Sequence, residues 1–463
     1  MVNNNKIILF VLVVLLAVLW GTVLLFSPIR GTAFLFSILL LSLIWIIFFR
    51  RPLLIFCSYF LIIVNLDNFV LMDNPVRVTV DIVVTSFLMI MIIYYFLVKK
   101  RNIEYAPLHI FYLITLIPCF ISLFVSLNVI LSVKFFFRLI SYLLISLGLF
   151  NTVADKKDIR KVLTFMALSA VIPCLFGYLQ HWGISFPGIV KYSGRIMEME
   201  EVSAERIGST LTHPVFFGLF LTVITPIVIH LFQTVYKRNT LLFICAIFVL
   251  LGSAVLSLAR APWVALLICL ILYCIFMKKV KILIVICCTV LFLYFLPVVH
   301  GRWADVISSP QESSFGWRIE LWKNALNLFS SRKQWVALGV GLDRFRDLSE
   351  MLGYWLKFNA HNDYIQRLID TGVWGLVLYV LFLFYVPLAL WKISKRLKDF
   401  ELKNLVVWCL SLHISLLFFQ MSNSIQPSQY VYYFSLITLA FKIGKLKVIG
   451  QLTFQPPLLQ TEK

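Results

Sequence analysis

Long runs of apolar residues, separated by short basic stretches, make up most of the chain. Most runs approach about 20 residues, the length of a helix that crosses the hydrocarbon core of a bilayer. The pattern predicts membrane spans near residues 7–26, 32–49, 52–70, 78–98, 108–127, 130–150, 162–180, 214–235, 240–258, 261–277, 282–299, 372–391, 404–422 and 428–443. We therefore expect an all-α integral membrane protein, a polytopic bundle of about 12–14 transmembrane helices in a single membrane domain over residues 1–463.

Two polar stretches interrupt this pattern, a loop at 181–213 and a large helical loop at 300–371. In the second, apolar residues recur at helical spacing on one face, which predicts an amphipathic helix lying along the membrane interface. These residues are Trp317, Leu321, Trp322, Ala325, Leu328 and Phe329. Gly339-Val-Gly341 further on indicates a turn and is too short a match for a nucleotide-binding loop.

The end of the large loop predicts a short helix over His361–Asp370. Asn359 is the expected N-cap, Asp363 and Arg367 have the spacing of an ion pair, and Gly372 is the expected terminator. The helix dipole disfavours a charged imidazole in the first turn. His361 is thus predicted to be neutral, as a general base must be.

Charge gives the predicted orientation. The chain is 61% hydrophobic and 13% charged, with a formal net charge of +20. Its basic clusters lie between apolar runs, so the positive-inside rule places them, and both termini, in the cytoplasm. The two polar loops then fall outside, and they hold 12 of the 21 acidic residues. The basic excess favours contact with membrane lipids, whereas a nucleic-acid partner would need a basic face on a soluble domain.

We find no sequence sign of a metal or a cofactor. All nine cysteines lie in apolar runs, no two histidines have zinc-ligand spacing, and no nucleotide-binding motif is present. The acidic cluster Glu198–Glu201 is interpreted as a solvated loop.

Cationic side chains on the predicted outer side are the remaining candidates for chemistry. Arg206, Arg260 and Arg318 stand on or beside outer loops, where guanidinium groups suit contacts with a diphosphate. Lys134 and Arg138 share one face of the span at 130–150, and charges inside a span usually face an aqueous cavity. Snorkelling or lipid-headgroup contact is the alternative for each of these residues.

Several motifs together resemble the O-antigen ligase and O-antigen polymerase family of polytopic membrane glycosyltransferases, over roughly residues 130–390. They are Arg206-Ile-Gly-Ser-Thr with His213-Pro, Ser257-Leu-Ala-Arg260, Trp317-Arg318 with Leu321-Trp322, Gly339-Val-Gly341, and His361-Asn-Asp-Tyr before Gly372-Val-Trp-Gly375. Many members read Ser-Arg-Gly where this chain has Ala259-Arg260-Ala261.

The resemblance implies a metal-independent, inverting transferase that acts on a polyprenyl-diphosphate-linked glycan at the outer face of the cytoplasmic membrane. His361 would be the general base, and Arg206 and Arg260 would bind the diphosphate. The expected substrate-binding residues are Arg138, Lys134, Arg318, Asn362 and Tyr364. The acceptor would be a glycan or a lipid-linked glycan, and no cofactor is expected.

Two other functions remain open from the residues alone. A transporter of a solute or glycan would use the arginines as a vestibule, with His361 structural. The absence of Asp and Glu from the middle of the predicted spans weakens this reading, because coupled transporters usually carry such groups. A non-enzymatic scaffold for envelope assembly would tolerate loss of Arg206 and Arg260 together.

Overall fold

The computed structural model describes most of the predicted bundle. It covers residues 52–66, 70–72, 78–99, 103–184, 196–197, 204–211, 213–295, 316–353 and 359–448. The predicted spans at 7–26 and 32–49, most of the loop at 181–213 and residues 300–315 of the large loop lie outside these ranges.

The described chain is almost entirely helical, which confirms the predicted fold class. The α-helices are α3 (Pro52–Leu66), α4 (Val80–Lys99), α5 (Pro107–Ile121), α6 (Val129–Thr152), α7 (Lys156–Leu168), α8 (Val171–His181), α9 (Pro214–Thr234), α10 (Thr240–Leu256), α11 (Arg260–Phe276), α12 (Val280–Tyr294), α14 (Gly316–Ser330), α15 (Lys333–Leu338), α16 (Phe345–Met351), α17 (Asp363–Arg396), α18 (Phe400–Phe419) and α19 (Pro427–Val448). Two 3₁₀ helices, η1 (Ser122–Val125) and η2 (Ser209–Leu211), accompany them. Two short antiparallel ribbons pair β1 (Val70–Met72) with β2 (Val78–Thr79) and β3 (Ile196–Met197) with β4 (Ala204–Glu205).

The predicted spans within the described residues fall largely on helices, although the one at 162–180 is divided between α7 and α8 and the one at 108–127 continues from α5 into η1. Six stretches of the described chain are long and apolar enough to cross a membrane, and shorter apolar helices accompany them. These six are Pro107–Val125, Val129–Thr152, Lys156–His181, Pro214–Thr234, Asp363–Arg396 and Phe400–Phe419. Some of the helices begin where a side chain satisfies the free amides of the first turn: Asn128 caps α6 and Asp399 caps α18.

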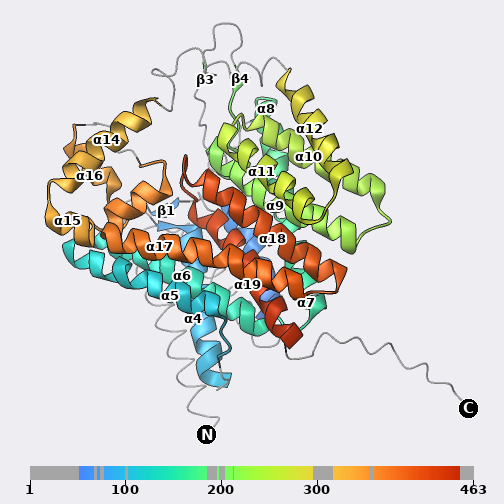
Figure 1. Ribbon diagram of the computed structural model, residues 1–463, viewed down its shortest axis with the longest axis horizontal. Coiled ribbons are helices and arrows are strands. Elements are labelled where there is room, and N and C mark those ends of the chain that lie inside the picture. The colour runs from blue at the N-terminus through green and yellow to red at the C-terminus, as the bar shows by residue number, and fades with distance from the viewer. Residues whose placement is uncertain are drawn as a thin grey trace, which may run out of the picture.

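The helices α14, α15 and α16 gather on one flank of the molecule and α10, α11 and α12 on the opposite flank, with α17 and α18 between them (Figure 1). The flank of α14–α16 has a hydrophobic core of its own. Its buried residues are Leu321, Ala325, Phe329, Trp335, Val340, Phe345, Leu348, Ala360 and Ile369. We call this set the loop core.

The loop core corrects one expectation. The apolar face of α14 is the predicted one, but Leu321, Ala325 and Phe329 pack inside the protein. Burial against α15–α17 already accounts for an amphipathic sequence, because a helix with one apolar stripe must cover that stripe with something. The apolar face of α14 therefore indicates a small folded unit. Its contacts with α15–α17 explain this face without a membrane surface.

The turn between α15 and α16 joins this unit to α17 by direct backbone contact. Val340 N–H donates to the carbonyl of Ile369 at 2.9 Å, and Gly341 N–H donates to that of Asp370 at 3.2 Å. Gly339 has φ +81°, and a Cβ built there would lie 2.2 Å from the Asp370 carbonyl oxygen. The predicted turn at Gly339–Gly341 is thus confirmed, and its glycines serve close packing.

The start of α17 differs from the prediction, whereas the break in α17 at Gly372 matches the predicted terminator. Asn362, not Asn359, is the N-cap, because its side-chain oxygen accepts the amides of Tyr364 and Ile365 at 3.0 Å. His361 therefore lies one residue before the cap, with φ +51°. At Gly372 the backbone is non-helical with φ +71°, so the helix is broken where a terminator was expected.

The backbone contact gives a test of stability. Gly339→Ala places a methyl group against the Asp370 carbonyl in addition to the left-handed strain of about 1–2 kcal/mol, so it should lower the melting temperature strongly. Gly353→Ala is the matched control, because Gly353 has φ +83° but nothing within 4 Å of its built Cβ. Melting of the purified protein in detergent measures both. Equal losses would show that the Gly339 contact contributes nothing beyond the strain.

Candidate functional site

His361 lies where the loop core meets the turn between α18 and α19, and three contacts fix its backbone. The indole Nε1–H of Trp322 donates to the carbonyl of Ala360 at 2.6 Å. Asp363 N–H donates to the Gln420 carbonyl at 2.9 Å, and the Asn362 amide donates to that of Met421 at 2.9 Å. The ring of Trp317 meets the His361 imidazole edge to face, with 6.0 Å between centroids. The histidine is therefore held between two separate parts of the chain.

The surroundings of His361 keep its imidazole neutral. Burial, followed by the positive charge of Arg318 and the nearby His213 and Arg346, lowers the pKa of His361 to about 4. Neutrality was predicted from a helix dipole, but the causes lie in desolvation and neighbouring cations. A neutral ring at physiological pH has one nitrogen able to accept a proton.

Arg318 and Arg260 come together from distant parts of the chain. Burial and the charge of Arg260 lower the pKa of Arg318 to about 10, so the two guanidinium groups are near enough to repel each other. Arg318 Nη1 donates to the Ser422 carbonyl at 2.9 Å, while its buried Nε has no hydrogen-bond partner among the described residues. Two cations held close together away from water destabilise the protein unless an anion binds between them.

Arg206 is on a segment that packs against the turn leading to Arg260. The neighbouring Ile207 N–H donates to the carbonyl of Leu256, four residues before Arg260, at 3.4 Å. His213 nearby caps α9, its Nδ1 accepting the Val215 amide at 3.2 Å. The structure thus brings the segments of Arg206 and Arg260 side by side, with Arg318 near Arg260 and His361 near Arg318. We call these four residues the His361 group.

Asn362 and Tyr364 already bond to the protein. Asn362 caps α17, and the Tyr364 hydroxyl donates to the Leu417 carbonyl at 3.0 Å. Both therefore tie the start of α17 to α18 and the turn that follows it. Their contact with a substrate stays a prediction.

Lys134 and Arg138 lie elsewhere, on the wall of a cavity of about 410 Å³ formed by α3, α4, α6 and α19. None of the His361 group lines this cavity. Arg138 acts electrostatically on Asp343, whose pKa is raised by burial and lowered in part by Arg346, Arg344 and Arg138. The predicted substrate-binding cations therefore form two sets.

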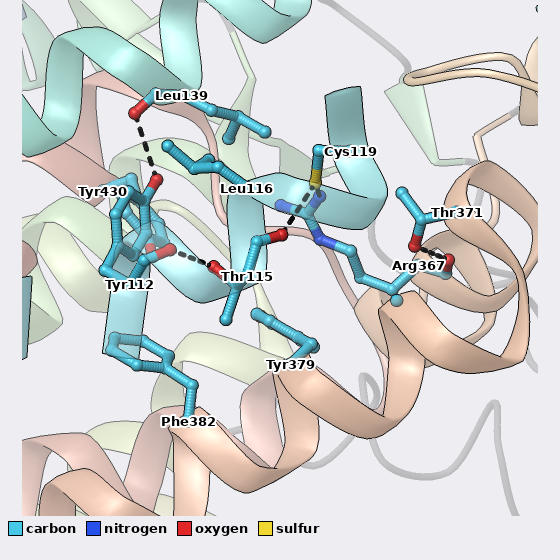
Figure 2. Close-up of a pocket in the computed structure, with 11 residues that line it drawn as sticks. Tyr112, Thr115, Leu116, Cys119, Leu139, Arg367, Thr371, Tyr379, Phe382 and Tyr430 are labelled. Atoms are coloured by element: carbon cyan, nitrogen blue, oxygen red, sulfur yellow. Dashed lines mark hydrogen bonds between the residues drawn. The ribbon is translucent and has the colours of Figure 1, made fainter. Parts of the chain in front are cut away.

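The ion pair that the sequence predicts between Asp363 and Arg367 is wrong. Among the described residues Arg367 forms no ion pair with Asp363, whose carboxylate instead accepts the Ile425 amide at 3.2 Å. Figure 2 shows Arg367 reaching from α17 toward α5, where Nη1 lies 3.5 Å from Cys119 Sγ. Its guanidinium also lies 5.2 Å from the centroid of the Tyr379 ring. The spacing of residues along α17 could not reveal that Arg367 has its partner on α5.

Metal-ligating side chains do not cluster in the part of the chain that the structure describes. No group of three or more His, Cys, Asp and Glu residues there has the geometry of a metal site. The cations of the His361 group are of the wrong charge for ligating a metal. They suit an anionic ligand.

A comparison with protein families matches residues 241–380 to the family described as O-antigen ligase. Over this segment the chain is similar to that family. The matched segment contains Arg260, Arg318 and His361, whereas Arg206, Lys134 and Arg138 precede it. The matched segment is shorter than the stretch of residues 130–390 over which the motifs resemble the family. No match is found among curated proteins.

The match supports an O-antigen ligase-like function in cell-envelope glycan biosynthesis. Together with the apolar helices of the described chain, it supports a membrane protein.

The lowered pKa of His361 can be measured without a substrate. Carbethoxylation modifies neutral imidazole, and the neutral fraction falls as pH falls through the pKa. Since the pKa is about 4, His361 should remain reactive well below the ordinary histidine value near 6.5. Mass spectrometry of the modified peptide at a series of pH values checks this.

Removing a neighbouring cation should raise this pKa. Arg346→Gln takes away one of the positive charges that disfavour the imidazolium, so the midpoint of the reactivity profile should move toward neutral pH by about half a unit to one unit. Lys323→Gln, an exposed change on α14, is the control. A midpoint unchanged by Arg346→Gln would mean that desolvation alone sets the pKa.

Proposed function

We propose that this protein transfers or polymerises a polyprenyl-diphosphate-linked glycan at the outer face of the cytoplasmic membrane, with His361 as general base. The observation that carries the proposal is the neutral imidazole of His361 beside Arg318, which is itself beside Arg260. A base and paired cations are the groups that displacement of a diphosphate requires.

The proposed reaction is a single displacement. The acceptor hydroxyl oxygen attacks the anomeric carbon of the donor while its proton passes to the free ring nitrogen of His361. The bond from the anomeric carbon to the diphosphate oxygen breaks, and its electron pair leaves with the diphosphate. Attack opposite the leaving group inverts the configuration at that carbon. His361 later returns the proton to solvent or product.

The guanidinium groups would act on the leaving group. Negative charge grows on the diphosphate as the bond breaks, and fixed cations in a water-poor site stabilise that charge with little reorganisation. Arg206, Arg260 and Arg318 supply this charge in the proposal, and mutual repulsion between Arg260 and Arg318 would be relieved by the anion. A metal-independent mechanism fits this arrangement.

The bound diphosphate would also improve the base. Cations lower the pKa of His361, so an anion placed among them offsets their effect and raises the pKa toward the working pH. The base would become stronger when the donor is present, which favours proton transfer in the complex over the empty enzyme.

Substitution of His361 tests the proposal. His361→Ala and His361→Gln should each reduce glycan transfer by about 100-fold or more, because a positioned base contributes on the order of 10²–10⁴ in rate. The measurement is transfer from a polyprenyl-diphosphate glycan by purified protein in lipid vesicles. His181→Gln, an exposed histidine outside the site, is the control.

Full transfer by a folded His361→Ala protein would remove the base from the mechanism. Glycan crossing vesicles without any change in linkage would favour the transporter alternative. In a deletion strain, free polymer with uncapped acceptor indicates a ligase, and single repeat units indicate a polymerase.

The cations have a separate test. Arg260→Gln together with Arg318→Gln should raise KM for the donor and lower kcat, because both binding and leaving-group stabilisation are weakened. Tolerance of the loss of Arg206 and Arg260 together would instead support the scaffold alternative.

A further inference from the structure

The C-terminal end of α18 presents backbone carbonyls that have no partner within the helix, because the last turn of a helix has no further amides beyond it. In this chain some of the donors come from the start of α17. The Tyr364 hydroxyl donates to the Leu417 carbonyl at 3.0 Å, and the Asp363 N–H donates to that of Gln420 at 2.9 Å. The segment that carries the proposed base is therefore fastened to the end of another helix.

The next two carbonyls extend this pattern to a second part of the site. The carbonyl of Met421 accepts the Asn362 side-chain amide at 2.9 Å, and that of Ser422 accepts Nη1 of Arg318, also at 2.9 Å. Adjacent Cα atoms of one chain lie about 3.8 Å apart. The three consecutive carbonyls of residues 420–422 thus limit how far the segment of the base can move from the guanidinium.

The turn after α18 holds the same segment at a further point. The Ile425 N–H donates to the Asp363 carboxylate at 3.2 Å. The start of α17 therefore has contacts at both ends of the turn over residues 420–425. A base that is aligned before its substrate arrives loses less freedom when the substrate binds.

The end of α18 is in turn anchored by the helical bundle. The Tyr379 hydroxyl donates to Gln420 Oε1, and Nε2 of His413 donates to the Leu383 carbonyl, each at 2.8 Å, which ties α18 to the second part of α17. His413 Nδ1 is hydrogen-bonded to the Tyr433 hydroxyl of α19. Both His413 and Gln420 are buried. These contacts hold the three carbonyls in place without the loop core.

We propose that the C-terminal end of α18 sets the position of His361 relative to Arg318, and that Asn362 is the positioning residue that couples the two. The inference rests on the proposed function, in which His361 takes the acceptor proton and Arg318 faces the leaving diphosphate. Asn362 makes two contacts with one side chain: its oxygen caps α17, and its nitrogen reaches the Met421 carbonyl. A residue that only caps a helix needs the oxygen alone.

Asn362→Ser separates these two contacts. Serine keeps an oxygen for the free amides of α17 but has no amide group to reach the Met421 carbonyl. The His361 segment should then move away from Arg318, whose positive charge would act more weakly on the imidazole. Because a weaker cation raises the pKa, the midpoint of the carbethoxylation profile of His361 should move toward neutral pH by about half a unit.

Glycan transfer gives the second readout of the same variant. We expect kcat to fall by about tenfold, because the base is misaligned, with little change in KM for the donor, because the cations still bind the diphosphate. Tyr433→Phe is the matched control. It removes a buried hydrogen bond to α18 at His413, about two turns before Gln420, and should change neither readout.

A double-variant cycle tests whether the effect depends on Arg318. In protein that already carries Arg318→Gln the charge is gone, so Asn362→Ser should cause no further movement of the midpoint. His213 and Arg346, which also act on the imidazole, are present in both backgrounds. An equal movement in both backgrounds would show that Asn362 only shields the ring from water, and would overturn the proposal.

The two readouts separate this inference from the proposed function. An unchanged midpoint in folded Asn362→Ser protein overturns the positioning role, whatever happens to transfer. A moved midpoint with full transfer supports the positioning role and removes His361 from the chemistry. Asn362→Thr, which also keeps a capping oxygen, takes the place of the serine variant if that protein does not purify in folded form.

Discussion

The candidate site depends on the approach of two backbones that have no side chain between them. Gly339 lies against Asp370, and Gly372 lies against Ala337, so the α15–α16 turn and the end of the first part of α17 are fitted to each other. The Asp370 carboxylate then accepts the amides of Asp343 and Arg344 at 2.9 and 3.2 Å. This joint fixes the loop core onto α17, and α14, which packs in the loop core, supplies Trp317 and Trp322, the two tryptophans that hold the His361 segment.

Unfavourable electrostatic interactions are concentrated around this joint between the loop core and α17. Arg318 and Arg260 repel each other, and His361 is kept neutral by the same cations. A protein stabilised only for folding would replace such groups with apolar ones, since desolvated like charges are unfavourable. Their presence together is consistent with a site whose anionic ligand completes the charge balance.

The sequence predicted the helical class, the position of most spans, the apolar face of α14 and the turn at Gly339, because each is set by local periodicity or by backbone freedom. It misplaced the cap of α17 by three residues, since Asn359 and Asn362 are equally good caps by type. It also paired Arg367 with Asp363, because spacing along one helix carries no information about α5. The separation of Lys134 and Arg138 from the His361 group likewise depends on packing between distant helices.

The interruption of α17 at Gly372 has a mechanical consequence. A continuous helix that spans a bilayer tilts as one rigid body. Spanning helices do tilt when the hydrocarbon thickness changes. In this chain the hydrogen-bonded ladder is interrupted at Gly372, nine residues after Asp363. Because the break separates two helical axes, the part of α17 before Gly372 can keep its contacts with the loop core while the part after it takes the tilt set by the neighbouring helices.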